Sequence, residues 1–241
     1  MFVAKKLEEL IEGESGWEIF QDWMNNSQNK VEILPATQEA KESTLVDMQV
    51  STRSLFGSII YKTGGILIDS GWIRILGSGC ERLPRSVADW NRDCLQMGMF
   101  EMPYHLMADD ITGGFFAYDA GGLGNRGSMF YFSPTILQWE DLELTYPEFV
   151  HWLVNGMNID DFYEGMRWDD WQQDLAKLPG DRAMLYLPFL FSVSAQQANG
   201  KDIFERKTVP VKELFEMYVE DLAPQAAKIP SGQTFEIRIE E

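Results

Sequence analysis

The stretch MPYHLMADDITGGFFAYDAGGLGNRGSMFYFSPTILQWEDLELTYPEFVHWLVNG, residues 102–156, alternates short apolar segments with turn-forming residues. Three of these segments are rich in aromatic side chains: YHLMA (104–108), FFAYD (115–119) and MFYFS (129–133). The pairs Asp109-Asp110 and Gly113-Gly114 separate the first two, and a glycine-rich run separates the second from the third. Strand-forming residues bounded by such turn signals predict an antiparallel meander.

The end of the same stretch predicts an amphipathic helix. Thr145 and Glu148 have the spacing of a capping box, in which two side chains satisfy backbone N–H groups of the first turn. Pro147 is tolerated in a first turn, residues 149–153 place apolar side chains on one face, and Gly156 suits the C-terminal cap. We therefore expect a strand meander followed by one helix to form the nucleus of the fold.

The flanking sequence predicts further elements. Helical patterns cover residues 5–11, 51–62 and 160–175, the last with a break near Arg167. Two more helices are expected, one that begins at Ser15 and one that follows Pro210. Residues 66–76 resemble a hairpin, and residues 185–193 and 235–239 resemble strands. Pro188 restricts the strand over 185–193 to a sheet edge or a bulge. Residues 25–35 and 77–98 are interpreted as loops, the second with one helical turn over 86–90. Residues 37–49 are polar and compatible with more than one structure.

Length and composition bound the fold class. The chain has 241 residues, 45% of them hydrophobic, with 8 Trp and 15 Phe. This content can fill a large core and argues against disorder. We expect a single elaborated α+β domain that spans residues 1–241. Trp139, Trp152, Trp168 and Trp171 lie on apolar helical faces or at strand ends, so we expect them to belong to the core.

The formal net charge of −18 bears on the possible partners. It repels phosphate backbones, so we expect no direct binding of nucleic acid. A basic protein is the natural electrostatic complement, although solubility in the cytosol explains the same charge. The first residues, MFVAKKLEELIEGESGW, contain no apolar run of signal-peptide length, and no segment approaches a membrane span. The expected location is therefore the cytoplasm, without membrane contact.

Cysteines and histidines are scarce, which limits metal and redox chemistry. Cys80 and Cys94 are the only cysteines, so a disulfide scaffold and a four-cysteine zinc site are excluded, and both are expected to be reduced packing residues. His105 and His151 are the only histidines and cannot form a multi-histidine site. We expect no bound metal. A nucleophile pair of Cys94 and His105 stays open, because sequence separation does not fix distance in a fold, but no surrounding motif supports it.

Residues 122–127, GLGNRG, match the pattern G-x-G-x-x-G of dinucleotide-binding proteins. In those proteins the glycines follow a strand and open a helix whose N–H groups hold the pyrophosphate. Here the strand-like segment MFYFS follows instead. Protein kinases place a glycine-rich loop between two strands, but the chain has no D-F-G or H-R-D motif. We interpret the run as a long hairpin loop and expect no cofactor.

The carboxylates Asp109, Asp110 and Asp119 could meet across the meander. Paired carboxylates serve acid–base chemistry or bind hard cations. Their spacing matches no calcium loop, however, and aspartate is a common turn residue. Turn chemistry is therefore the favoured interpretation, with all three at the ends of strands.

Three motifs of the chain carry a family resemblance: residues 108–119 (ADDITGGFFAYD), 131–153 (YFSP through the helix YPEFVHWL) and 162–171 (FYEGMRWDDW). Together they resemble an uncharacterised bacterial family, domain of unknown function 2625, over nearly the whole chain. The order of glycine pairs, strands and the final helix also resembles the SUKH superfamily, named after a yeast regulator of cell-wall synthesis.

The SUKH resemblance implies a non-enzymatic α+β domain in which helices pack against an antiparallel sheet. Many SUKH members are immunity proteins that neutralise toxins, so it also implies a toxin-like protein partner and no catalytic residues. An acidic surface would steer a basic partner. The candidate contacts are Asp109, Asp110, Glu140 and Asp141, which we expect at exposed positions flanking the meander.

Two other classes of function stay open. The chain could be a small-molecule hydrolase or transferase that uses Asp109, Asp119 and His105 beside the glycine loop, provided that these side chains converge. It could also be a structural protein that oligomerises through exposed aromatic side chains. The sequence does not fix the oligomeric state.

Overall fold

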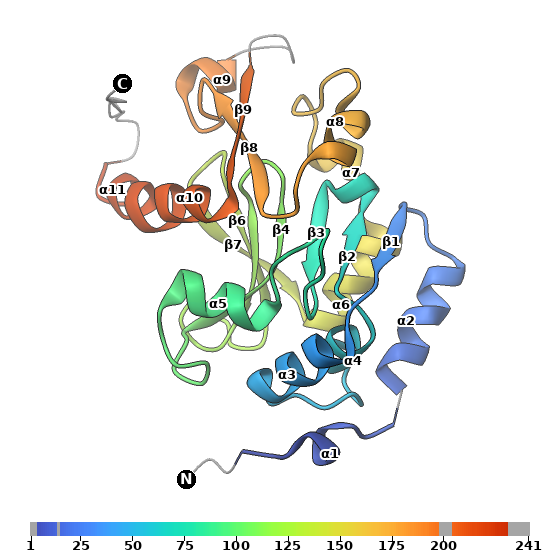
Figure 1. Ribbon diagram of the computed structural model, residues 1–241. Coiled ribbons are helices and arrows are strands. Elements are labelled where there is room, and N and C mark those ends of the chain that lie inside the picture. Colours follow the sequence, from blue (N-terminus) through green and yellow to red (C-terminus); the bar gives the residue numbers. More distant parts are fainter. Residues whose placement is uncertain (1–3, 14, 198–203, 231–241) are drawn as a thin grey trace.

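The computed structural model describes residues 4–13, 15–197 and 204–230, and these residues form a seven-stranded antiparallel sheet (Figure 1). Its strands are β1 (Val31–Leu34), β2 (Gly65–Ile68), β3 (Ile73–Leu76), β4 (Tyr104–Asp110), β5 (Phe115–Asp119), β6 (Met129–Ser133) and β7 (Gln138–Leu144). Each strand pairs with the next in sequence, from β1 at one edge to β7 at the other. The predicted meander and the α+β class are confirmed.

The central strands lie where the sequence places them. β4, β5 and β6 contain the three aromatic segments, and β2 and β3 form the predicted hairpin. The hairpin turns through a short 3-10 helix, η1 (Asp69–Gly71), with Asp69 and Ser70 at positive φ. Gly64, which directly precedes β2, packs tightly against other backbone. A Cβ atom at this position would lie 2.6 Å from the carbonyl oxygen of Pro35. The glycine before the hairpin is thus required by packing.

Both edge strands are absent from the sequence prediction. β1 has four residues and lies inside the segment 25–35 that was expected to be a loop. β7 reads QWEDLEL and forms the other edge of the sheet, and its charged side chains are exposed. Charged residues on an edge strand discourage pairing with other chains. They also weaken the hydrophobic alternation by which a strand is found in sequence.

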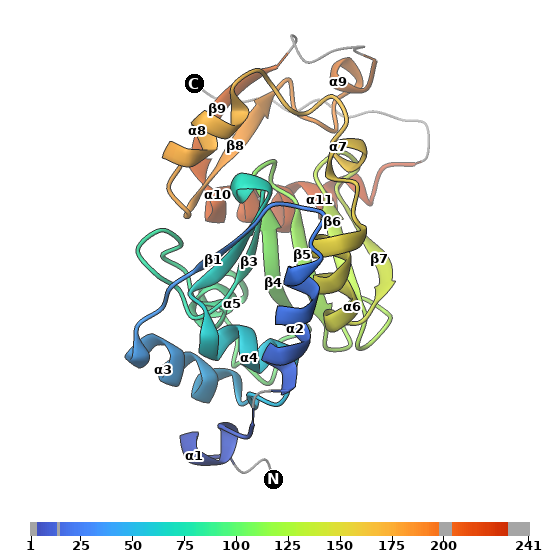
Figure 2. The same ribbon diagram turned by 90° about the vertical axis from the view of Figure 1, so that its right-hand side faces the viewer.

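Helices cover both faces of the sheet. Figure 2 shows α2, α4 and α6 on one face, and Figure 1 shows α5 and α10 on the other side. The helices are α1 (Leu7–Leu10), α2 (Ser15–Asn25), α3 (Gln38–Met48), α4 (Leu55–Lys62), α5 (Val87–Leu95), α6 (Tyr146–His151), η2 (Trp152–Gly156), α7 (Ile159–Phe162), α8 (Trp171–Lys177), α9 (Val193–Gln197), α10 (Val211–Phe215), η4 (Glu216–Leu222) and α11 (Ala223–Ala226). Within the described residues, none of them combines the length and hydrophobicity needed to cross a bilayer.

Local capping signals predict the helix starts well. α6 begins with the predicted capping box, in which the backbone N–H of Thr145 donates to Glu148 Oε2 at 2.8 Å. It continues through the π turn η2 to Gly156, as expected. The ambiguous residues 37–49 form α3, which is capped by the Thr37 hydroxyl at 3.2 Å from the N–H of Ala40.

Two predicted boundaries are wrong, and one predicted break is confirmed. α5 runs well beyond the single turn expected over 86–90, because Ser86 caps it and the left-handed Gln96 ends it only after Leu95. The helical pattern over 160–175 forms two short helices, α7 and α8, and the break between them contains Arg167, as expected, with Asp170 in the left-handed region. The strand expected over 185–193 is β8 (Arg182–Leu187), which stops before Pro188.

The last segments form a separate ribbon. β8 pairs with β9 (Glu205–Pro210) in a two-stranded antiparallel sheet, drawn in orange at the top of Figure 1. The backbone N–H of Met184 in β8 donates to Ile111 at 2.7 Å and so joins the ribbon to the end of β4. α10 follows Pro210 as predicted. The strand expected over 235–239 lies outside the described residues.

The fully buried core is built from other aromatic side chains than the four tryptophans that the sequence predicts. The largest fully buried side chains include Trp72, Tyr163, Phe115, Phe116, Phe132, Phe149 and Phe215. Trp139, Trp152, Trp168 and Trp171 are half-buried and pack against this core from its border. Assigning them to the fully buried core is therefore wrong. Trp139 lies on an edge strand, Trp152 and Trp171 lie on short helices, and Trp168 lies in the segment between α7 and α8.

Candidate functional site

Asp109 lies at the centre of a buried ion cluster and is 0% exposed. Arg74 Nη2 lies 2.5 Å and Arg85 Nη1 2.7 Å from its two carboxylate oxygens. Arg85 also donates to the carbonyl of Gly180 at 2.8 Å, and Arg74 to that of Arg182 at 2.5 Å. Two cations compensate for the desolvation of one carboxylate and hold the ribbon segment against β3 and β4. The expectation that Asp109 is an exposed turn residue is wrong.

Asp110 is a second buried acceptor, also 0% exposed. Its Oδ1 accepts hydrogen bonds from the N–H and hydroxyl of Thr112 and from the N–H of Gly114, at 2.6 to 2.9 Å. Its Oδ2 accepts the hydroxyls of Tyr131 at 2.8 Å and Tyr163 at 2.9 Å. A Cβ atom on Gly114 would lie 2.2 Å from Asp110 Oδ2. The glycine is therefore required by the carboxylate, and exposure of Asp110 is likewise a wrong expectation.

Asp119 organises the glycine-rich loop between β5 and β6. It is 0% exposed, and its Oδ1 accepts the N–H groups of Gly121, Gly122 and Leu123 at 2.6 to 3.0 Å. Its Oδ2 accepts the N–H of Asn125 at 2.9 Å. Burial alone would raise the pKa of Asp119, but these backbone hydrogen bonds outweigh it and lower the pKa. The predicted hairpin loop is confirmed, and its amides bind the chain's own carboxylate.

Glu140 and Asp141 are exposed on β7, as expected. Asp141 is nevertheless engaged, because it accepts the Ser128 hydroxyl and, at 2.6 Å, the side-chain amide of Asn125. It also accepts the N–H of Glu143 at 2.8 Å, in a bulged part of the strand where Glu143 has a φ of 55°. Asp141 therefore joins the glycine loop to the sheet edge. Of the four predicted contact residues, Glu140 is the one whose carboxylate makes no hydrogen bond or ion pair to another described residue.

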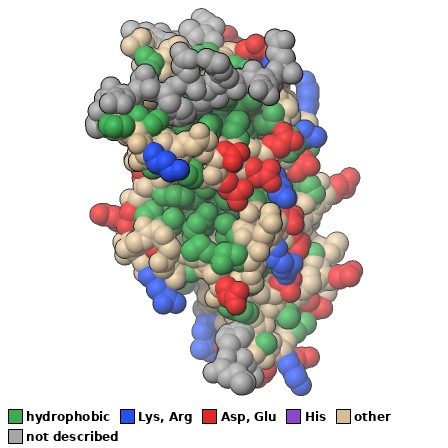
Figure 3. Space-filling model, turned by 90° about the vertical axis from the view of Figure 1, so that its left-hand side faces the viewer, with side chains coloured by type: hydrophobic (Ala, Val, Ile, Leu, Met, Phe, Trp, Pro, Cys, Tyr) green, Lys and Arg blue, Asp and Glu red, His purple; other side chains and the backbone are tan. Residues whose placement is uncertain are grey.

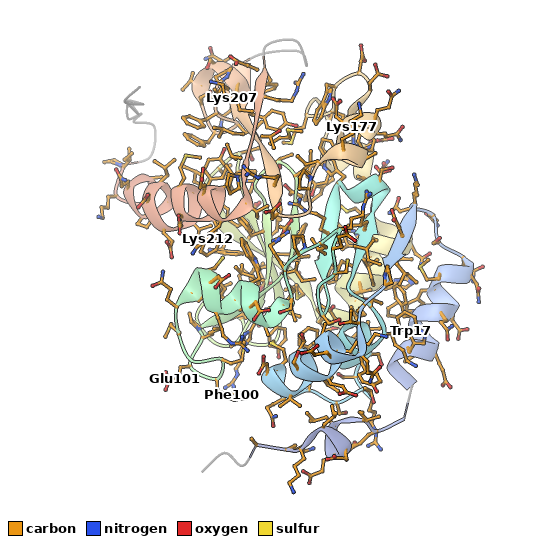
Figure 4. The ribbon with its side chains drawn as sticks, in the orientation of Figure 1. Trp17, Phe100, Glu101, Lys177, Lys207 and Lys212 are labelled. Atoms are coloured by element: carbon orange, nitrogen blue, oxygen red, sulfur yellow. The ribbon has the colours of Figure 1, made fainter. Side chains whose placement is uncertain are left out.

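A larger group of carboxylates lies on α10 and η4, which the sequence interpretation assigned only to packing. We call Glu213, Glu216, Glu220 and Asp221 the acidic patch. Burial and repulsion by Glu216 and Asp221 raise the pKa of Glu220, whereas Lys212 opposes the rise. Lys212, labelled below α10 in Figure 4, reaches Glu216 at 3.8 Å. Because Lys212 is a single positive charge beside four carboxylates, the patch stays strongly acidic.

The acidic patch adjoins aromatic side chains of the sheet. Tyr104 and Trp139 are half-buried, with ring centroids 5.2 Å apart. Phe215 of α10 packs on Phe115 of β5 with ring centroids 5.3 Å apart. The strand register puts Phe115 on the same sheet face as Tyr104 and Trp139, so α10 covers the face that carries this pair. Burial and the carboxylate of Glu220 both raise the pKa of Tyr104. Figure 3 faces this side of the molecule and shows acidic side chains gathered above an area of hydrophobic ones. Aromatic side chains with a charged border are typical of protein interfaces.

The motif FYEGMRWDDW forms an internal cation–π cluster. The guanidinium carbon of Arg167 lies 4.9 Å from the ring centroid of Trp72 and 4.3 Å from that of Trp171. The same guanidinium forms ion pairs with Asp69 and Asp160. Because the chain's own arginine occupies the space between the indoles, the motif holds η1 against α7 and α8. A structural role accounts for its residues.

The side chains of the possible enzymatic site do not converge. Across β4 and β5, His105 pairs with Tyr118 and Tyr104 pairs with Asp119. Neighbouring residues of a strand point to opposite faces, so His105 and Asp119 lie on different sides of the sheet. Asp109 is fully engaged by its two arginines. The three residues therefore form no common acid–base site.

Cys94 and His105 are also separated by the sheet. Cys94 lies on α5, which covers the same side of the sheet as α10 (Figure 1), whereas His105 points to the opposite face with Tyr118. Burial raises the pKa of Cys94, which keeps the thiol protonated and unreactive. Cys80 and Cys94 are both free, as predicted. Across the part of the chain that the structure describes, no group of three or more His, Cys, Asp or Glu side chains could hold a metal ion.

The geometry thus defines an α+β protein built on an antiparallel meander. Its buried carboxylates, Asp109, Asp110 and Asp119, have structural roles, and its acidic patch lies on the helix formed by α10 and η4. The chain belongs to the family described as "Protein of unknown function DUF2625", whose model matches residues 7–214. The Escherichia coli (strain K12) protein YbfG, named as uncharacterized, is 38% identical over 215 residues, which cover 88% of this chain and 95% of YbfG.

A second relative, an "Uncharacterized protein" of Haemophilus influenzae (strain ATCC 51907 / DSM 11121 / KW20 / Rd), is 42% identical over 187 residues. The match covers 76% of this chain and 82% of the relative. No solved structure matches the chain. The family membership expected from the three motifs is confirmed.

Proposed function

We infer that the protein is a non-enzymatic cytoplasmic binding protein of the toxin-immunity type, which engages a basic protein through its acidic surface. The observation that supports this proposal is the acidic patch on α10 and η4, on the sheet face that carries the half-buried pair Tyr104 and Trp139. Glu213, Glu220 and Asp221 are exposed. Burial and repulsion from Glu216 and Asp221, partly opposed by Lys212, raise the pKa of Glu220. A cationic partner would relieve that repulsion.

Two of the four residues expected to contact a partner are buried. Asp109 and Asp110 cannot reach a partner in the folded protein, because both are 0% exposed. Glu140 is exposed on β7, but it pairs with Tyr131 and points to the sheet face opposite to that of Trp139, so it is a weaker candidate contact. Asp141 contributes charge while it holds the loop. The resemblance to SUKH immunity proteins supports a protein partner, and the net charge of −18 supports a basic one.

The experiment compares two charge reversals of equal size in the full chain. Glu220→Lys with Asp221→Lys changes the acidic patch, whereas Glu32→Lys with Glu39→Lys changes exposed positions on β1 and α3. The wild-type chain is first used to isolate a basic partner, for example the product of a neighbouring reading frame. Association rates are then measured at two salt concentrations.

We expect the patch variant to associate at least about tenfold more slowly, because rim charges act mainly on the association rate. The control variant should stay within about twofold of wild type, because Glu32 lies on β1 at the sheet edge opposite to β7, Glu39 lies on α3, and exposed charges are screened over a Debye length of roughly 8 Å. Added salt should slow the wild-type reaction. Recovery of no basic partner, a rate independent of salt, or equal rates for the two variants would contradict the proposal.

A further inference from the structure

A cavity of about 370 Å³ opens between the sheet and the helices α4 and α6. Its floor is buried, since Leu55 of α4, Met107 of β4 and Tyr146 of α6 are 5%, 3% and 5% exposed. Phe100, in the loop after α5, lies at its mouth, is 60% exposed and is labelled in Figure 4. The cavity is therefore a pocket with depth, and its volume falls in the range of roughly 300–1,000 Å³ that is typical of small-molecule sites.

The wall of the cavity is mainly apolar. Besides Phe100, it is built chiefly from aromatic rings and methionines: Phe56, Tyr118, Tyr146, Met48, Met99 and Met107. Aromatic rings offer a large apolar area, and methionine side chains adapt to the shape of a ligand and make favourable contacts with its rings. An apolar molecule in this cavity would leave water and would cover part of the exposed Phe100 ring, and both changes favour binding.

The polar groups of the lining do not select a polar or charged ligand. Tyr146 Oη and His105 Nδ1 are buried and so out of a ligand's reach. The Ser54 hydroxyl already donates to Ser51 and accepts from the N–H of Gly57. No Lys, Arg, Asp or Glu is among the described residues that line the cavity, and burial lowers the pKa of His105, so the imidazole is neutral near pH 7. A charged ligand would therefore leave water without a counter-charge.

We propose that this cavity is a binding site for an uncharged, hydrocarbon-like small molecule, held by contacts with aromatic rings and methionine side chains and not by hydrogen bonds. A protein partner fits it less well, because a stable protein interface covers about 800 Å² on each partner, whereas this site is a single deep pocket. The proposal is independent of the proposed function. None of the acidic-patch residues lines the cavity, so the two can fail separately.

Three probes of similar size test the recognition: naphthalene, 2-naphthol and 2-naphthoate, titrated into the full chain. We expect naphthalene to bind saturably. 2-Naphthol should bind no more tightly, because its hydroxyl leaves water without gaining a partner. 2-Naphthoate should bind at least about tenfold more weakly, because its carboxylate finds no counter-charge.

Methionines with ¹³C-labelled methyl groups report the titration and locate the site. The signals of Met48, Met99 and Met107 should shift with naphthalene, whereas that of Met184, outside the cavity, should not. Without ligand, the same signals should be independent of protein concentration. A second copy of the chain seated in the cavity would make them depend on it.

A pair of matched variants tests the site itself. Val50 lines the cavity, so the indole of Val50→Trp should fill part of it and weaken naphthalene binding at least about tenfold. Val46→Trp is the control, because Val46 is exposed on α3 and does not line the cavity, and it should change the affinity less than about twofold. Tyr146→Phe should also leave the affinity unchanged, since the buried hydroxyl contacts no ligand.

The proposal is overturned if naphthalene does not bind to the folded wild-type protein, or if 2-naphthol or 2-naphthoate binds more tightly than naphthalene. It is also overturned if the shifted methyl groups lie elsewhere, or if the free protein's signals at the cavity change with its concentration. Because the probes are compared on the wild-type chain, the outcome does not depend on whether a variant folds.

Discussion

The hydroxyl of Tyr163 donates a hydrogen bond of 2.9 Å to Asp110 Oδ2, although the two residues are 53 positions apart. The same oxygen accepts the hydroxyl of Tyr131 at 2.8 Å. One carboxylate therefore joins all three sequence motifs of the family, because these residues belong to ADDITGGFFAYD, YFSP and FYEGMRWDDW. Burial and the carboxylate of Asp110 raise the pKa of both tyrosines, so their hydroxyls remain donors.

We expect Tyr163→Phe to lower the free energy of unfolding by about 1 to 3 kcal/mol, because it removes a buried hydrogen bond to a carboxylate. Urea unfolding at constant m-value measures the change. The control is Tyr61→Phe, which removes an exposed hydroxyl contact and should change stability by less than about 0.5 kcal/mol. Equal urea midpoints for the two variants would mean that Asp110 does not depend on Tyr163.

Asp109→Ala should be the more damaging carboxylate substitution. It leaves Arg74 and Arg85 buried without a counter-charge, which typically costs about 3 to 5 kcal/mol. The control is Asp47→Ala, which breaks an exposed ion pair with Arg92 and should cost at most about 1 kcal/mol. A chain that keeps its wild-type melting temperature after Asp109→Ala would contradict the role of this cluster.

The loop carboxylate Asp119 should make stability depend on acid pH. Its pKa is lowered in the folded protein, so its stabilising contribution is complete above the unfolded pKa of about 3.9 and is lost as the pH falls through the folded value. Asp119→Asn should therefore cost about 1 to 3 kcal/mol at pH 7, and the difference from wild type should shrink below about pH 4. Urea unfolding at pH 7, 5 and 3 checks this. A gap that stays constant would rule out the carboxylate as its source.

Replacing a fully buried tryptophan should lower the free energy of unfolding more than replacing a half-buried one. Trp72 is 0% exposed and contacts Tyr163 and Trp171, so Trp72→Ala should cost about 3 to 5 kcal/mol. Trp152 is half-buried on η2, so Trp152→Ala should cost clearly less. Thermal unfolding of both variants gives the order. If Trp152→Ala is the more destabilising of the two, the border assignment is wrong.

Short-range features of the fold could be predicted from the sequence alone. The strands β4, β5 and β6 follow from aromatic segments between glycine and aspartate turns, because side-chain alternation and turn geometry depend on adjacent residues. The start of α6 follows from the Thr145–Glu148 capping box for the same reason. The glycine loop was placed correctly between two strands. The edge strand β7 was missed because its exposed charges interrupt the apolar pattern.

The environment of the carboxylates was decided only by the tertiary structure. In the local sequence, Asp109 and Asp110 have the composition of a turn, and nothing nearby distinguishes an exposed aspartate from a buried one. Their burial depends on Arg74 and Arg85 from earlier segments and on Tyr163 from a later one. A carboxylate leaves water only where such distant donors and cations compensate for its desolvation, and the folded chain alone brings them together.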